Sequence, residues 1–170
     1  MNLEELYTKH SKQVFNLALQ YVQNREDAEE ITQDVFIKVH NSFETFKQES
    51  KVSTWIYRIT INTSLDYIKA KKRKKRFGIF TSLFHQESNE VKYESASFDH
   101  PGVEMEQKEA TAKIFQYINE LPENQKTALI LNKIEHQSQA EIAEIMELSP
   151  KAVESLIQRA KANLEKKIKH

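Results

Sequence analysis

Near the carboxyl end of the chain, the stretch QSQAEIAEIMELSPKAVESLIQRAK (137–161) places several long polar side chains on one face of a predicted helix. Such side chains reach base edges and phosphates when a helix lies in the major groove of DNA. An ordinary helical hairpin in an all-α core is the alternative, and this stretch alone does not decide between them. The residues that would read DNA are Lys151, Glu154, Ser155, Gln158 and Arg159.

Two start signals predict the helices that hold this face. Ser138, with Glu141 three residues later, matches a capping box and predicts a first helix that runs to about Met146. Ser149 is a favourable N-cap and Pro150 fits the first helical position, so a second helix is predicted after a tight turn. The predicted buried stripe of this second helix is Val153, Leu156, Ile157, Ala160 and Leu164.

A run of seven bases without an acid, Lys69 to Arg76 (KAKKRKKR), follows a segment that contains several aromatic residues. Aromatic rings stack on unpaired bases and basic side chains neutralise phosphates, a combination typical of sites for single-stranded nucleic acid. The alternative is that Trp55 is a core residue and the bases solubilise a helix end; we expect Trp55 to do both in part. The β-branched ITINT (59–63) fits a strand by itself, but three- and four-residue apolar spacing around it predicts a helix.

A separate acidic run, EDAEEITQD (26–34), holds five carboxylates and no base. The whole chain has a formal net charge of zero, so the two runs are separated charges within a neutral protein. Separation of this kind suggests a basic partner for one face and an anionic partner for the other. Clustered solvated helix faces are the alternative for both runs.

Composition favours helix and excludes several classes of site. The 170 residues include two glycines, three prolines and no cysteine, which excludes disulfides, thiolate metal sites and cysteine nucleophiles. The six histidines are scattered, and neither an HExxH pair nor a glycine-rich phosphate loop occurs, so we expect no catalysis, no metal and no cofactor. No apolar segment approaches the roughly 18 residues of a membrane span, which predicts a soluble, cytoplasmic protein without membrane insertion.

The predicted fold is all-α, with two small helical domains joined by a flexible linker. One amphipathic helix is expected from Leu3 to about Gln23, and Asn24 is expected to cap the next. The linker, 77–106, contains both glycines and is acidic; its apolar start, FGIFTSLF (77–84), is expected to dock on a domain or a partner protein. The domains are therefore 1–76 and 107–170, and the second is a four-helix unit that contains the helix-turn-helix pair.

Four stretches, taken together and in this order, resemble the sigma factors of bacterial RNA polymerase, in particular the two-domain extracytoplasmic-function group. The resemblance covers nearly the whole chain except the linker. The stretches are NREDAEEITQDVFIKV, STWIYRITINTSLDYIKAKKRKK, LPENQKTALILNKIE and SQAEIAEIMELSPKAVESLIQRAK.

The resemblance implies a role for each region. Domain two of the family, here 1–76, binds a coiled coil of the largest polymerase subunit and captures the melted minus-ten strand; domain four, here 107–170, reads the duplex minus-thirty-five element through its final helix pair. The implied polymerase contacts are Asp27, Glu30, Gln33 and Asp34. The implied minus-ten residues are Lys51, Ser53, Thr54, Trp55, Arg58 and Asn62, with Lys69, Lys72 and Arg73 on phosphates.

The expected function is that of a non-enzymatic initiation factor whose partners are core RNA polymerase and promoter DNA, with an anti-sigma protein as a common partner of the family. A stand-alone helix-turn-helix regulator that does not bind core polymerase is the alternative. Many family members have glycine where this chain has Glu147 and His136, and basic residues where it has Glu154 and Leu156. These departures concern the two turns and the promoter sequence that is read.

Overall fold

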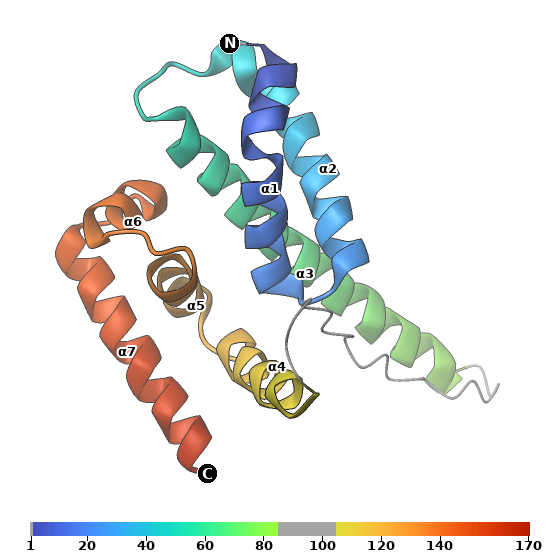
Figure 1. Ribbon diagram of the computed structural model, residues 1–170. Coiled ribbons are helices and arrows are strands. Elements are labelled where there is room, and N and C mark those ends of the chain that lie inside the picture. Colours follow the sequence, from blue (N-terminus) through green and yellow to red (C-terminus); the bar gives the residue numbers. More distant parts are fainter. Residues whose placement is uncertain (1, 85–104) are drawn as a thin grey trace.

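The computed structural model describes residues 2–84 and 105–170, and every regular element in these residues is a helix (Figure 1). The expected all-α class is therefore confirmed. The first part contains α1 (Leu3–Val22), α2 (Arg25–Ser42), a short 3-10 turn (Phe43–Thr45) and α3 (Val52–Phe84). The second part contains α4 (Met105–Asn119), α5 (Glu123–Leu129), a π-helical turn (Ile130–Ile134), α6 (Gln139–Met146) and α7 (Pro150–Lys169).

Helices α1, α2 and α3 pack against one another around an apolar core. The predicted boundary between α1 and α2 is confirmed, because the Asn24 side chain accepts a hydrogen bond from the Asp27 N–H at 3.0 Å. Side chains at three- and four-residue spacing on each helix are buried, as the amphipathic pattern requires. The fully buried side chains of this core include Leu6, Val14, Ala18, Ala28, Ile31, Val35, Val39 and Ile56.

The ITINT segment is helical, as the surrounding period predicted. Thr60 is fully buried, and its hydroxyl donates to the Ile56 carbonyl at 2.8 Å, so the polar group is satisfied inside the helix. Helix α3 does not stop at Arg76 but continues to Phe84, and α4 begins at Met105. Helix therefore occupies both ends of the segment expected as a linker, and its remainder lies outside the described residues. Residues 69–84, which comprise the basic run and the segment up to Phe84, contain no proline that would end the helix.

The helix pair α6–α7 has the predicted starts. Ser138 and Glu141 form the reciprocal capping box, and the Ser149 hydroxyl accepts from the Ala152 N–H at 3.1 Å. Each of the two positions where relatives have glycine adopts a left-handed conformation, with φ of 54° at His136 and 56° at Glu147. A non-glycine residue in this region costs roughly 1–2 kcal/mol, so both turns keep the glycine geometry with some strain.

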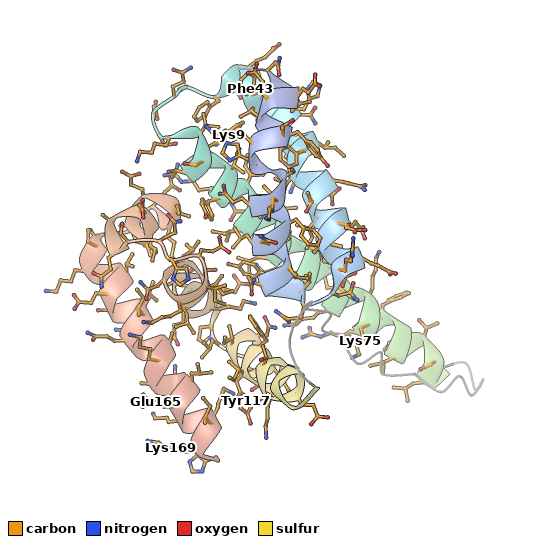
Figure 2. The ribbon with its side chains drawn as sticks, viewed as in Figure 1. Lys9, Phe43, Lys75, Tyr117, Glu165 and Lys169 are labelled. Carbon is orange, nitrogen blue, oxygen red and sulfur yellow. The ribbon has the colours of Figure 1, made fainter. Side chains whose placement is uncertain are left out.

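The two parts share a second core, which the sequence did not indicate. Leu17, Tyr21 and Ile61 of the first part lie in one buried cluster with residues of α4 to α7, including Leu131 and Ile142. Side chains of both parts fill the space between α3 and α5 (Figure 2). The Tyr21 hydroxyl lies 2.7 Å from Thr127 Oγ1 across this boundary. None of the helices described is long and apolar enough to cross a lipid bilayer.

Candidate nucleic-acid and protein interfaces

The acidic helix α2 presents three of its four predicted contact residues on one exposed face. Glu30, Gln33 and Asp34 are exposed, while the opposite face of the helix is buried in the first core. Ile37 shares this face and is 58% exposed. The surface combines negative charge with one apolar contact, a composition suited to a partner protein. The sequence analysis did not single out Ile37, although its position one turn after Gln33 signals the shared face.

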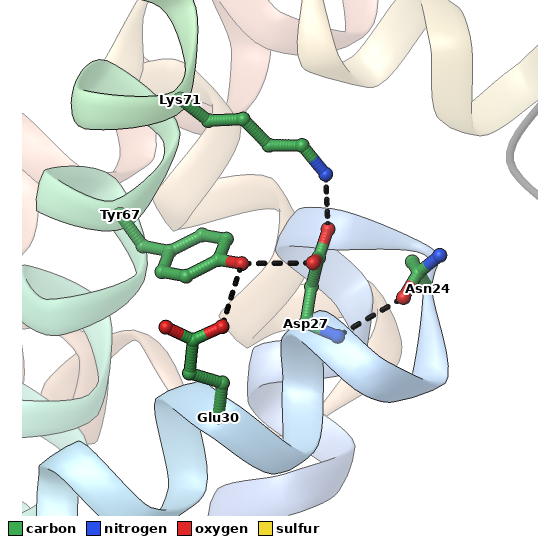
Figure 3. A network of polar contacts seen from close by, with 5 residues as sticks. All are labelled: Asn24, Asp27, Glu30, Tyr67 and Lys71. Carbon is green, nitrogen blue, oxygen red and sulfur yellow. Dashed lines mark hydrogen bonds and ion pairs between the residues drawn. The ribbon is translucent and has the colours of Figure 1, made fainter. Parts of the chain in front are cut away.

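The fourth predicted contact, Asp27, is half-buried, and both of its carboxylate oxygens bind α3 (Figure 3). The Tyr67 hydroxyl lies 2.8 Å from Asp27 Oδ1 and 3.1 Å from Glu30 Oε2, and Lys71 Nζ lies 2.6 Å from Asp27 Oδ2. Burial, with the Asp27 hydrogen bond and charge next, raises the pKa of Tyr67, so its phenol stays a neutral donor. Asp27 thus joins α2 to α3 in this structure.

The start of α3 and the loop before it carry the predicted minus-ten residues in mixed environments. Trp55 is half-buried and stacks on Phe46, with ring centroids 4.5 Å apart and planes inclined by 23°. Its partial burial agrees with a core role in part, and its stacking on unpaired bases stays a prediction. Thr54 is buried at 7% exposure and Ser53 is half-buried, whereas Lys51 is exposed.

Arg58, predicted to contact the melted strand, binds the carboxyl end of α6 in this structure. Its Nη2 donates to the Glu144 carbonyl at 2.5 Å and its Nε to the Ile145 carbonyl at 3.2 Å. Nη1 lies 3.8 Å from Glu147 Oε1. The last carbonyls of a helix lack intrahelical partners and carry the negative end of its dipole, so a guanidinium is a favourable cap there. Asn62 is exposed and lines the adjoining cleft, which α6 borders.

The predicted phosphate contacts on α3 are exposed, and one of them joins the two parts. Lys69 Nζ lies 3.1 Å from Glu123 Oε1 at the start of α5. Lys72 and Arg73 are exposed on the same helix.

Helix α7 buries one side against α5 and α6 and exposes the other. Val153, Ile157 and Ala160 are buried, and Leu156 and Leu164 pack against the same core, as predicted. Four of the five predicted reading residues are exposed and Ser155 is half-buried. The exposed ones are Lys151, Glu154, Gln158 and Arg159. A short helix, a tight turn and a second helix with a free polar face form the arrangement that places a helix in the major groove.

Each half of the chain matches a family model of the sigma-70 factors. Residues 6–74 match sigma-70 region 2, and residues 111–164 match sigma-70 region 4. The sigma-E factor of Haemophilus influenzae, an extracytoplasmic-function (ECF) factor, is 35% identical over 163 residues, which cover 96% of this chain and 85% of that protein. The chain belongs to the extracytoplasmic-function sigma factors.

Other relatives agree with this membership. The sigma-H factor of Pseudomonas aeruginosa is 30% identical to this sigma factor over 161 residues, 95% of this chain and 83% of that protein. Two solved structures share the fold over 98% of this chain. They are CnrH in complex with the cytosolic domain of CnrY (TM-score 0.66, 21% identity, 87% of that chain) and the Bartonella quintana sigma factor RpoE in complex with the anti-sigma factor NepR (TM-score 0.63, 18% identity, 96% of that chain).

In the part of this sigma factor that the structure describes, no group of histidine and carboxylate side chains could hold a metal ion. The polar contacts between its two parts include a cluster at Tyr57. The Tyr57 hydroxyl lies 3.2 Å from Glu135 Oε2, and Gln137 Nε2 donates to the same hydroxyl at 3.3 Å. Tyr57 lies 78 positions from Glu135 and 80 from Gln137 in sequence, so no local pattern could have predicted these contacts.

Replacing Glu135 with glutamine is expected to stabilise this sigma factor near neutral pH. Burial is the main cause that raises the pKa of Glu135 from its ordinary 4.5, and the Tyr57 hydrogen bond opposes it only in part. A carboxyl whose pKa is higher in the folded state makes folding more favourable as pH falls toward that pKa, because the folded state then binds the extra proton. Glutamine mimics the protonated form and still accepts from Tyr57. The difference in the free energy of unfolding between variant and parent should therefore shrink on acidification. Urea unfolding of both proteins at neutral pH and at an acidic pH measures this difference. A difference that does not change with pH contradicts the argument.

Proposed function

We propose that this sigma factor binds core RNA polymerase in the cytoplasm and directs transcription initiation at specific promoters, without catalytic activity of its own. The observation that carries the proposal is the joint match to regions 2 and 4, in order and in one chain. We assign polymerase binding and capture of the melted strand to residues 1–76, and reading of upstream duplex DNA to residues 107–170. The segment 77–106 connects them, with α3 extending into it.

The polymerase-binding surface that we propose is the exposed face of α2. Glu30, Gln33 and Asp34 supply its polar contacts, and we add Ile37 as an apolar contact within the same patch. Asp27 supports this surface indirectly, because its bonds to Tyr67 and Lys71 hold α2 against α3.

The melted-strand site requires that the two parts separate. In the packed arrangement the Arg58 guanidinium is engaged by α6, and Asn62 faces a cleft lined by Ile145 and Met146. A single strand that uses both side chains has to displace α6. We propose that the promoter complex forms from an opened arrangement, in which Lys51, Trp55, Arg58 and Asn62 face the strand. Lys69, Lys72 and Arg73 then contact its phosphates.

The packed arrangement also suggests a regulatory partner. Two solved structures with this fold were determined as complexes, one with the cytosolic domain of CnrY and one with the anti-sigma factor NepR. We propose that an anti-sigma protein binds this chain as well and favours an arrangement in which the DNA-contacting residues are covered.

Run-off transcription with purified core polymerase on a promoter library tests the proposed function. We expect initiation at a subset of promoters only when this chain is present, and co-purification of the chain with core enzyme. The alternative, a stand-alone helix-turn-helix regulator, predicts binding to duplex DNA without core polymerase. Absence of both initiation and co-purification would reject the sigma function in favour of that alternative.

Replacing Lys72 and Arg73 with glutamine should reduce the salt dependence of promoter binding. Each lost phosphate contact lowers the slope of log affinity against log salt by about 0.9 on duplex DNA and about 0.7 on a single strand. The binding of the polymerase complex to a promoter fragment, measured over a range of potassium chloride concentrations, gives this slope. The matched control replaces Lys9 and Lys12, two exposed lysines of α1, and should leave the slope unchanged. An equal slope for all three proteins would assign the basic run to solvation alone.

A further inference from the structure

A cavity of about 310 Å³ lies between the two parts of the chain, where α3 passes the ends of α4 and α5. Four lysines line it, three from α3 and one from α5, against a single carboxylate, that of Asp27. The lysines are Lys71, Lys72, Lys75 and Lys126. Two tyrosine side chains and the Asn119 amide complete the polar part of the wall. Lysines therefore outnumber carboxylates in the described lining of the cavity.

Lys126 is the residue that makes this cavity unusual. It is only 5% exposed, and its Nζ lies 5.3 Å from the centroid of the Tyr21 ring. Burial, followed by the neighbouring charge of Lys72, lowers the pKa of Lys126. A buried ammonium group is costly unless an anion or several acceptors compensate it, and a contact with a ring face compensates it only in part.

The carboxylates nearest to Lys126 already pair with other lysines, and Asp27 does so with Lys71 of the same cavity wall. Asp27 accepts from Tyr67 at 2.8 Å and from Lys71 at 2.6 Å. Glu123, whose charge also reaches Lys126, pairs with Lys69 at 3.1 Å. Among residues 2–84 and 105–170, no carboxylate forms an ion pair with Lys126. Asn119 Oδ1 is likewise buried without a hydrogen-bond partner in these residues, so it can accept from a hydroxyl or a water molecule.

We propose that this cavity binds a small phosphate-rich anion of the size of tripolyphosphate and that the bound anion holds α3 and α5 together. Lysine ammonium groups are strong point-charge partners of phosphate oxygens, and several phosphates in one ligand match several lysines in one wall. The volume lies at the lower end of small-molecule pockets, which suits a compact anion.

The site exists only while the two parts are packed, because Lys126 comes from the second part and the other lysines from the first. A ligand that binds one arrangement and not the other stabilises the first by mass action. The anion would therefore favour the packed arrangement over an opened one.

Isothermal titration of the full chain with sodium tripolyphosphate tests the site. We expect saturable binding that Lys126→Met weakens about tenfold or more, since the variant loses a charge-assisted hydrogen bond to the phosphate. Lys74→Met is the matched control, because Lys74 belongs to the same basic run and does not line the cavity. It removes the same charge and should change the affinity less than about twofold. Lys126→Arg keeps the charge and should retain binding.

Amide hydrogen exchange tests whether the anion joins the two parts. Exchange through opening slows by the factor one plus the ratio of ligand concentration to Kd, so amides of α5 and the following π-helical turn should gain protection in the parent and in Lys74→Met. Lys126→Met should gain little. Unchanged exchange at saturating tripolyphosphate would reject the bridging role.

Three results would overturn the proposal as a whole. The first would be that tripolyphosphate fails to bind the full chain. The second would be that Lys74→Met weakens the binding as much as Lys126→Met does, which would indicate a diffuse attraction to the basic run. The third is that a single-stranded oligonucleotide binds with the same dependence on Lys126 and displaces tripolyphosphate, which would assign the cavity to nucleic acid.

Discussion

Alanine at Glu30, Gln33 and Asp34 together is expected to abolish the binding of this sigma factor to core RNA polymerase while its domains stay folded. The three side chains lie on one exposed face of α2 and contribute nothing to the buried core. Truncation of central interface residues costs about 1–2 kcal/mol each or more, so three together should lower the affinity by at least about a hundredfold. Co-purification with core enzyme and run-off transcription are the measurements.

The fold should tolerate this triple change because alanine is a good helix former and the positions are exposed. Glu30 accepts one hydrogen bond from Tyr67, but that hydroxyl keeps its bond to Asp27. A matched control removes two carboxylates and one amide elsewhere, at the exposed residues Glu4, Asn16 and Glu109. Equal co-purification of both triple variants would place the polymerase contact on another surface. Ile37→Ala, added singly to the parent, tests whether the apolar residue belongs to the same patch.

A covalent bond between Lys69 and Glu123 is expected to abolish promoter-directed transcription. A carbodiimide activates a carboxylate as an O-acylisourea, and a neighbouring lysine amine then attacks the acyl carbon, forms an amide and displaces a urea. The Lys69 and Glu123 groups lie 3.1 Å apart on opposite parts of the chain. The bond would hold α5 beside α3 and so keep Arg58 on the carboxyl end of α6. Because we propose that the melted strand needs Arg58 and Asn62, residual transcription should equal the fraction of chain that is not cross-linked between these residues. Peptide mass analysis measures that fraction.

Glu123→Gln is the control for this cross-link. It removes the reacting carboxylate and leaves two other close pairs, Lys71 with Asp27 and Lys167 with Glu120, each of which joins residues of the same part. The treated variant should therefore remain active. Full activity of the Lys69–Glu123 cross-linked chain would show that initiation does not require separation of the two parts.

Local signals were strong enough to predict most helix starts and turns of this protein. The Ser138 capping box and the caps at Asn24 and Ser149 depend on residues within a few positions of one another. The backbone of a short segment samples such contacts even without the rest of the chain. The sequence left open whether His136 and Glu147 adopt the left-handed geometry of a glycine, and both do. Gly78 and the loss of the charge pattern after Arg76 predict a break in α3. Yet Gly78 has open space around it, and the helix continues.

The candidate surfaces were predictable in composition and less so in detail. The separation of charges along the chain predicted an acidic face on α2, and the helical period of 3.6 residues predicted the polar face of α7. Neither signal separates Asp27, which binds Tyr67 and Lys71, from Glu30 and Asp34, whose positions on the same helix are exposed. The distinction depends on where α3 crosses α2, which residues of α2 alone do not specify.

By itself the sequence determined the helical class, the order of the helices, their caps and turns, and the family. Only the tertiary structure decided that α6 covers Arg58, that Tyr57 meets Glu135, and that Lys126 faces the lysines of α3. Those contacts join residues 78 or more positions apart in the hydrogen-bonded cases. A cap or a periodic stripe has its partners within a few residues, whereas a contact between two parts of a chain forms only after both have packed their cores.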